Sequence, residues 1–133
     1  MRFLLDTHIL VWWVHNDIGK LSKAQSHALA ASGEADEPVG LSAISLWELA
    51  MLRQRGRLNT TKPLDDLIRD VESHTLVSII GLDGVIAAES VRLGEDFHRD
   101  PADQIIVATA RCHDLTLVTA DERIRRWGKV RVL

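Results

Sequence analysis

The stretch Arg99-Asp-Pro-Ala-Asp-Gln-Ile-Ile-Val-Ala-Thr-Ala110 shows how this chain combines acids with apolar elements. Asp100 before Pro101 predicts a helix N-cap followed by a proline at the first helical position. Asp103 then falls in the first turn, where an acid suits the positive end of the helix dipole. The following residues are apolar, so we expect a largely buried helix that runs to His113.

The composition is that of an ordinary single domain. The chain has 133 residues, 46% hydrophobic and 26% charged, which is enough for one sizeable core, so we expect one domain over residues 1–133. The longest uncharged apolar run, 9–14, is too short to cross a bilayer, and Asp6 and His8 interrupt any signal-peptide pattern. The one cysteine excludes an internal disulfide. We therefore expect a cytoplasmic protein with no membrane segment.

Short apolar strands alternate with helices along the chain. We expect strands at residues 2–5, 39–41, 76–80, 115–118 and 130–133, and helices at 7–14, 22–31, 42–55, 63–73, 83–93, 100–113 and 121–127. Helices between parallel strands cover both faces of a sheet. The predicted fold class is therefore α/β, a three-layer α/β/α sandwich around a central parallel sheet of about five strands.

Three acids fall at one edge of this predicted sheet. Asp6 directly follows the first strand, Asp121 closely follows the strand at 115–118, and Asp103 lies at a helix start, which belongs to the same edge. Ligands of open α/β sheets bind beyond the carboxyl ends of the strands. We therefore expect these carboxylates to lie at a ligand site.

Glu48 is a fourth acid, placed inside the predicted helix 42–55. Ile44 lies four residues before it and Leu52 four residues after it, so the three side chains share one apolar stripe. This spacing directs the carboxylate toward the core side of the helix. A buried, unpaired carboxylate is costly. Glu48 therefore needs an arginine, a pocket of N–H donors, or a cation shared with other acids.

The acids also have purely structural explanations. Asp6 and Asp100 can cap helices, and Thr119 with Glu122 matches a capping box. If the four acids converge, however, two carboxylates about 4 Å apart repel by about 4 kcal/mol at an effective dielectric constant of 20. A divalent cation removes that repulsion, and oxygen ligands select Mg²⁺ or Mn²⁺ over zinc. Such a centre supports hydrolysis of phosphodiester bonds.

The basic residues are clustered, although the net charge is −3. One segment contains Arg53, Arg55, Arg57 and Lys62, and a second contains Arg123, Arg125, Arg126, Lys129 and Arg131. A solvated surface explains both segments, and so does contact with the phosphates of a polyanion. The four tryptophans have two explanations as well, burial as the default and base stacking as the alternative.

Four segments resemble the signature blocks of PIN-domain nucleases, specifically of VapC-like toxins of type II toxin–antitoxin pairs. They are residues 4–13, 45–50, 98–110 and 117–121, in the family's order. The resemblance implies a PIN-like fold and a Mg²⁺- or Mn²⁺-dependent endoribonuclease that hydrolyses RNA with metal-activated water. It also implies a homodimer, and a small cognate antitoxin as the inhibitor.

The resemblance also implies site residues by position. Asp6, Glu48, Asp103 and Asp121 match the family's acidic quartet and would be both metal ligands and catalytic residues. The supporting residues are Thr119, Asp100 and His8. For His8, contact with a substrate phosphate and a structural hydrogen bond are equal alternatives. The candidate RNA-binding residues are Arg53, Arg55, Arg57, Lys62 and Arg99.

Two other functions remain alternatives. A structure-specific DNA or flap nuclease of related fold uses the same chemistry, but usually adds acids and insertions for which this short chain has little room. A receiver-like signalling domain also binds Mg²⁺ at strand ends, but needs a second acid where Leu5 precedes Asp6. The complete quartet argues against an inactive binding module. We therefore favour the ribonuclease.

Overall fold

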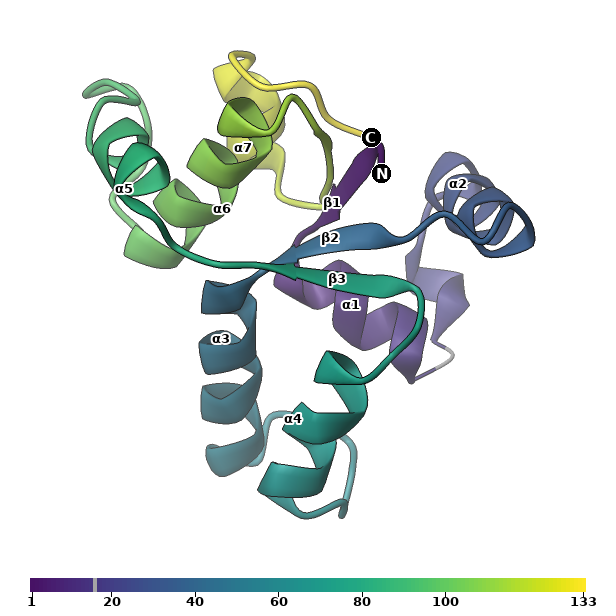
Figure 1. Cartoon of the computed structure of the whole chain (residues 1–133). Coiled ribbons are helices and arrows are strands. Elements are labelled where there is room, and N and C mark those ends of the chain that lie inside the picture. Colours follow the sequence, from purple (N-terminus) through teal and green to yellow (C-terminus); the bar gives the residue numbers. More distant parts are fainter. Residues whose placement is uncertain (16) are drawn as a thin grey trace.

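Four short strands form one parallel sheet in the computed structural model, which describes residues 1–15 and 17–133 (Figure 1). The strands are β1 (Phe3–Leu5), β2 (Val39–Ser42), β3 (Val77–Ile80) and β4 (Thr116–Val118), in the order β3-β2-β1-β4. Leu5 of β1 is in register with Leu41 on one side and Val118 on the other. The carboxyl end of β1 therefore lies between those of β2 and β4.

Helices cover both faces of this sheet, as the sequence predicts. In Figure 1, α5, α6 and α7 lie on one side of the sheet, and α1, α3 and α4 lie on the other. The helices are α1 (Thr7–Val14), α2 (Lys23–Glu34), α3 (Ala43–Gln54), α4 (Leu64–Glu72), α5 (Gly84–Ser90), α6 (Pro101–Cys112) and α7 (Glu122–Trp127), with a short 3-10 helix at Ile18–Lys20. Within the described residues, no helix has the length and apolar character needed to span a membrane.

The sheet separates two apolar clusters. Side chains alternate between the faces of a strand, so adjacent residues join different clusters. Leu4 and Leu117 pack in the cluster formed with α6 and α7, whereas Leu5 and Val118 pack in the cluster formed with α1, α3 and α4. All four side chains are fully buried. Trp47 departs from the default of burial, because 55% of it is exposed.

The predicted fifth strand, at residues 130–133, is reduced to a single β-bridge. Leu133 N donates to Leu117 O (2.9 Å), and Leu117 N donates to Arg131 O (2.9 Å), but only Val132 is bridged to β4. The turn at Gly128, where φ is 75°, ends α7 and leaves few residues to pair. Two helix ends differ from the prediction by three residues, because α2 continues to Glu34 and α5 stops at Ser90.

Candidate metal centre

Asp6 is held at the end of the central strand, where 9% of it is exposed. Its backbone N–H donates to Val118 O (3.0 Å), which continues the pairing of β1 with β4. Its carboxylate accepts two hydrogen bonds, from Thr7 N (2.9 Å) and from Thr119 Oγ1 (2.7 Å). Asp6 therefore caps α1, and it is also held by a residue that follows β4.

Thr119 joins two of the acids. Its buried hydroxyl accepts a hydrogen bond from Asp121 N (3.0 Å) and donates its own proton to Asp6. The capping box suggested by Thr119 and Glu122 does not form. Asp121 is instead the N-cap of α7 and accepts from Arg123 N (2.8 Å). Thr119 therefore links the carboxylate of Asp6 to the backbone N–H of the residue that caps α7.

Glu48 lies on α3 and is half-buried. Its Oε1 accepts a hydrogen bond from Thr7 Oγ1 (2.6 Å), and that hydroxyl also lies 2.9 Å from Ser45 Oγ. Ile44 and Leu52 are half-buried too, so the predicted stripe lies at the rim of the core. Because α1 begins at Thr7, this hydroxyl connects α3 directly to the residue that follows Asp6.

Asp103, on α6, is the other nearly buried acid, with 8% exposed. Its Oδ2 lies 2.6 Å from His98 Nε2 and 3.6 Å from Arg123 Nη2. Arg123 also contacts Asp121 Oδ2 at 3.0 Å, so one guanidinium serves two acids. Asp100 caps α6 as predicted and accepts from the backbone N–H groups of Ala102 (3.0 Å) and Asp103 (3.3 Å).

The four acids of the predicted quartet line one cleft of about 330 Å³. They reach it from the starts of α1, α6 and α7 and from within α3, so four separate segments contribute. The remaining lining residues are His8, Trp12, Asp100, Ala120 and Arg123. His8 is exposed, and its ring makes no hydrogen bond within residues 1–15 and 17–133. The structure thus brings together all the acids that the sequence singled out.

The candidate RNA-binding residues lie outside this cleft. Arg53 donates from Nε to Lys62 O (2.9 Å), and Lys62 pairs with Asp70. Arg57 and Arg99 line two further pockets, while Arg55 is exposed. These five residues therefore have different surroundings, although four of them are close in sequence.

His98 and Arg123 are site residues that the sequence interpretation missed. His98 stands at the start of the 98–110 signature block, and Arg123 follows Asp121 by two residues. Both positions were visible in the sequence, but their contacts depend on side-chain conformation. His98, Asp103 and Asp121 each offer an atom to a shared ion, with these atoms within 4.8 Å of one another.

Burial and mutual repulsion make the ionised form of three acids costly. Burial raises the pKa of Asp6 in spite of the hydrogen bonds from Thr119 and Thr7. Burial also raises the pKa of Asp103, and it raises that of Glu48 to about 6, helped by the charges of Asp103 and Asp6.

Asp121 behaves differently from those three acids. Burial by itself would raise its pKa, but the hydrogen bonds and charge of Arg123 hold the pKa below its ordinary value. Of the four acids of the quartet, one is therefore kept ionised by a protein cation, and three are ionised at a cost.

This donor set fits a divalent cation. Arg123 contacts the carboxylates of Asp103 and Asp121. In the part of the chain that the structure describes, by contrast, no Lys, Arg or His nitrogen lies within 4 Å of the carboxylates of Asp6 or Glu48. The arginine partner considered for Glu48 is therefore absent from these residues. Clustered carboxylate oxygens are the ligands that hard divalent cations prefer.

Fold and acidic cleft together correspond to a known class of nuclease domain. Residues 3–130 match the PIN domain, so the chain belongs to the PIN-domain family. It is 38% identical over 122 residues to Ribonuclease VapC22 of Mycobacterium tuberculosis (strain ATCC 25618 / H37Rv). The aligned region covers 92% of this chain and 88% of that protein. The family predicted from the four sequence blocks is confirmed, and it replaces the receiver-like alternative.

Solved structures share the fold over almost the whole chain. VapBC2 from Rickettsia felis, bound to a DNA fragment from its promoter, gives a TM-score of 0.74 at 17% identity, with 100% of this chain and 98% of that chain covered. A toxin–antitoxin complex from Klebsiella pneumoniae gives a TM-score of 0.64 at 26% identity, with 98% of this chain and 94% of that chain covered. At 17% identity, the likeness to VapBC2 shows a shared fold alone.

Neutralising Glu48 should stabilise the metal-free protein at neutral pH. The pKa of Glu48 rises on folding from its ordinary 4.5 to about 6, so folding favours the protonated form. The protonated Glu48 side chain therefore stabilises the fold at low pH, and this contribution is lost as the pH rises from 4.5 through about 6. In EDTA, Glu48→Gln should match the parent near pH 4.5 and exceed it by about 1 to 2 kcal/mol above pH 7, measured by denaturant unfolding. A less stable variant at pH 7 would mean that the Glu48 charge holds the fold.

Removing Arg123 should tighten metal binding. The guanidinium and a divalent cation compete for the oxygens of Asp103 and Asp121. We expect Arg123→Ala to bind Mn²⁺ about twofold to fivefold more tightly than the parent in calorimetric titration. Arg126→Ala is the matched control, because Arg126 lies on the same helix, donates to Glu122 O, and within the described residues makes no ion pair with Asp103 or Asp121. Equal Mn²⁺ affinity in the two variants would exclude this competition.

Proposed function

We propose that this chain is a metal-dependent endoribonuclease and the toxin of a toxin–antitoxin pair, with Mg²⁺ or Mn²⁺ as its cofactor. The observation that carries the proposal is the convergence of Asp6, Glu48, Asp103 and Asp121, from four segments, on one cleft. Membership of the PIN-domain family and 38% identity to a protein named a ribonuclease support RNA as the substrate.

In this proposal, the chain's own residues hold the reacting groups in place. The four acids bind the cation, which when present polarises the phosphate and activates water. Thr119 orients Asp6, Thr7 orients Glu48, and His98 orients Asp103, each through a hydrogen bond of 2.7 Å or less. These three contacts fix the carboxylates before the substrate arrives, which lowers the cost of assembling the reactive geometry.

The proposed partner is a small antitoxin protein. Its support is the likeness, at 26% identity, to a chain solved in a toxin–antitoxin complex. We expect the antitoxin to insert a basic side chain among the acids, because Arg123 already demonstrates that a guanidinium fits between Asp103 and Asp121. The protein would act in the cytoplasm, where its RNA substrate is found.

Cleavage should depend on the metal and distinguish RNA from DNA. Purified protein should cut structured RNA in Mg²⁺ or Mn²⁺ and lose this activity in EDTA, because the proposed mechanism activates water through a cation held by the carboxylates of the cleft. Double-stranded DNA should stay mostly intact. Gel analysis of end-labelled substrates measures this. Undiminished cleavage in EDTA, with contamination excluded, would reject the mechanism. Preferential cleavage of a DNA flap would instead favour the alternative nuclease.

Asp6→Asn should abolish cleavage without loss of stability. The amide keeps the shape of the side chain but removes a charge whose burial raises the pKa of Asp6. We expect the metal-free variant to melt at or above the parent temperature and to gain much less from added Mn²⁺. Asp65→Asn, at an exposed acid of α4, is the matched control and should retain activity. A marked loss of stability in EDTA would assign Asp6 a purely structural role.

A further inference from the structure

Two further cavities adjoin the acidic cleft, one on each side. The first, of about 600 Å³, shares His8 and Trp12 with the cleft. The second, of about 570 Å³, shares Arg123 with it. The shared residues place the acidic cleft between the other two. The three cavities therefore form a series, adjoining at His8 and Trp12 on one side and at Arg123 on the other.

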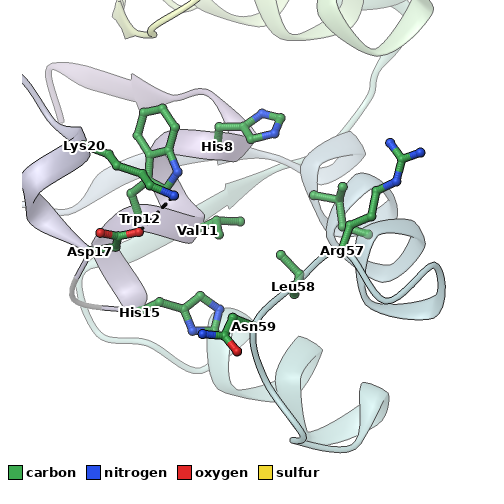
Figure 2. Close-up of a pocket in the computed structure, with 10 residues that line it drawn as sticks. His8, Val11, Trp12, His15, Asp17, Lys20, Arg57, Leu58 and Asn59 are labelled. Carbon is green, nitrogen blue, oxygen red and sulfur yellow. Dashed lines mark ion pairs between the residues drawn. The ribbon is translucent and has the colours of Figure 1, made fainter.

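Figure 2 shows the first cavity between α1 and the segment that follows α3. His8 and Trp12 lie on the α1 side, and Arg57 and Leu58 lie on the opposite side. Lys20 reaches over the indole of Trp12, with Nζ 6.0 Å from the ring centroid. Lys20 also pairs with Asp17 of the same cavity at 3.1 Å, so its charge is compensated. A half-buried tryptophan with Arg57 across the cavity suits a nucleotide, because the ring stacks on a base while the guanidinium meets a phosphate.

The second cavity is also basic. Arg99, Arg123 and Arg126 line it, together with His98, against two acids, Glu95 and Asp96. Asp96 is already paired with Lys129 at 2.9 Å, so its charge is compensated. Arg99 is exposed, and no ion pair of Arg99 occurs within the residues that the structure describes.

The charges of the three cavities differ in how they act on the phosphates of a nucleic acid. Carboxylates in the central cleft repel every phosphate except the one that a bound cation receives. An endonuclease must nevertheless hold phosphates on both sides of the bond that it cuts. Basic cavities on each side supply those contacts, without reading the sequence of the strand.

We propose that single-stranded RNA runs through all three cavities, with one flank held by Arg57 and Trp12 and the other by Arg99. This inference rests on the proposed function, because it extends the substrate of the same site. It assigns separate flanks to two arginines that are far apart in the sequence. It also separates Arg57 from Arg55, which is exposed and lines none of the three cavities.

Binding of one-sided RNAs tests the path. Mapping the bond that the parent cuts allows two labelled RNAs to be made, one with a flank only on the 5′ side of that bond and one only on the 3′ side. Neither RNA contains that bond, so the parent protein serves as the background, and fluorescence anisotropy in Mg²⁺ gives its affinity for each. Arg57→Ala should weaken one RNA by about threefold to tenfold, and Arg99→Ala should weaken the other.

Matched controls and a second variant sharpen the result. Arg55→Ala and Arg92→Ala remove exposed arginines that line none of the three cavities, and both should bind like the background. Trp12→Leu keeps apolar packing but removes the stacking surface, so it should weaken the same RNA as Arg57→Ala. Its melting temperature reports whether it folds.

Each other outcome has one meaning. If Arg57→Ala and Arg99→Ala weaken the same RNA, or both behave like the controls, the path is wrong. Unchanged RNA affinity in Arg57→Ala alone would also overturn it and leave the first cavity to a protein segment. If the parent protein binds neither RNA and cuts no structured RNA, the proposed function itself fails, which is a different result.

Discussion

Repulsion among carboxylates at the carboxyl edge of the sheet is the constraint on which the rest of the structure depends. Burial raises the pKa of Asp6, Glu48 and Asp103, so the fold holds these acids at a cost in stability. The chain offsets part of that cost with hydroxyl, imidazole and guanidinium donors aimed at individual oxygens. Stability alone would not select this arrangement. A ligand that carries positive charge explains why the fold tolerates it.

The structural and functional explanations of the acids turn out to be compatible. Asp6, Asp100 and Asp121 each accept a hydrogen bond from a backbone N–H at a helix start, as helix caps do. The same three side chains line the cleft. Both roles coincide because the connections after β1 and β4 are very short, which brings helix starts to the ends of the strands. In this architecture, an acid that caps a helix directly after a strand therefore lies at the edge of the sheet where ligands bind.

Local patterns predicted most of the fold, and they failed where contacts join distant segments. The strands Phe3–Leu5 and Thr116–Val118, and the acids that follow them, were predicted from the sequence. The contact of His98 with Asp103 and that of Thr7 with Glu48 depend on side-chain conformations that no spacing rule specifies. Gly56, with φ at 66°, turns the chain after α3 and gives Arg55 and Arg57 different surroundings. Grouping basic residues by sequence therefore does not specify the contacts that each of them makes.

The pairing of β1 with β4 also governs when the protein can become active during its own synthesis. Leu5 is aligned with Val118, so the central strand is completed by a segment that leaves the ribosome much later. A nascent chain that already contains Asp6, Glu48 and Asp103 still lacks both the hydroxyl that orients Asp6 and the last carboxylate. Parallel pairing between distant segments also forms slowly. The acidic cleft is therefore complete only after Thr116–Val118 and the residues that follow it have left the ribosome and paired with the first strand.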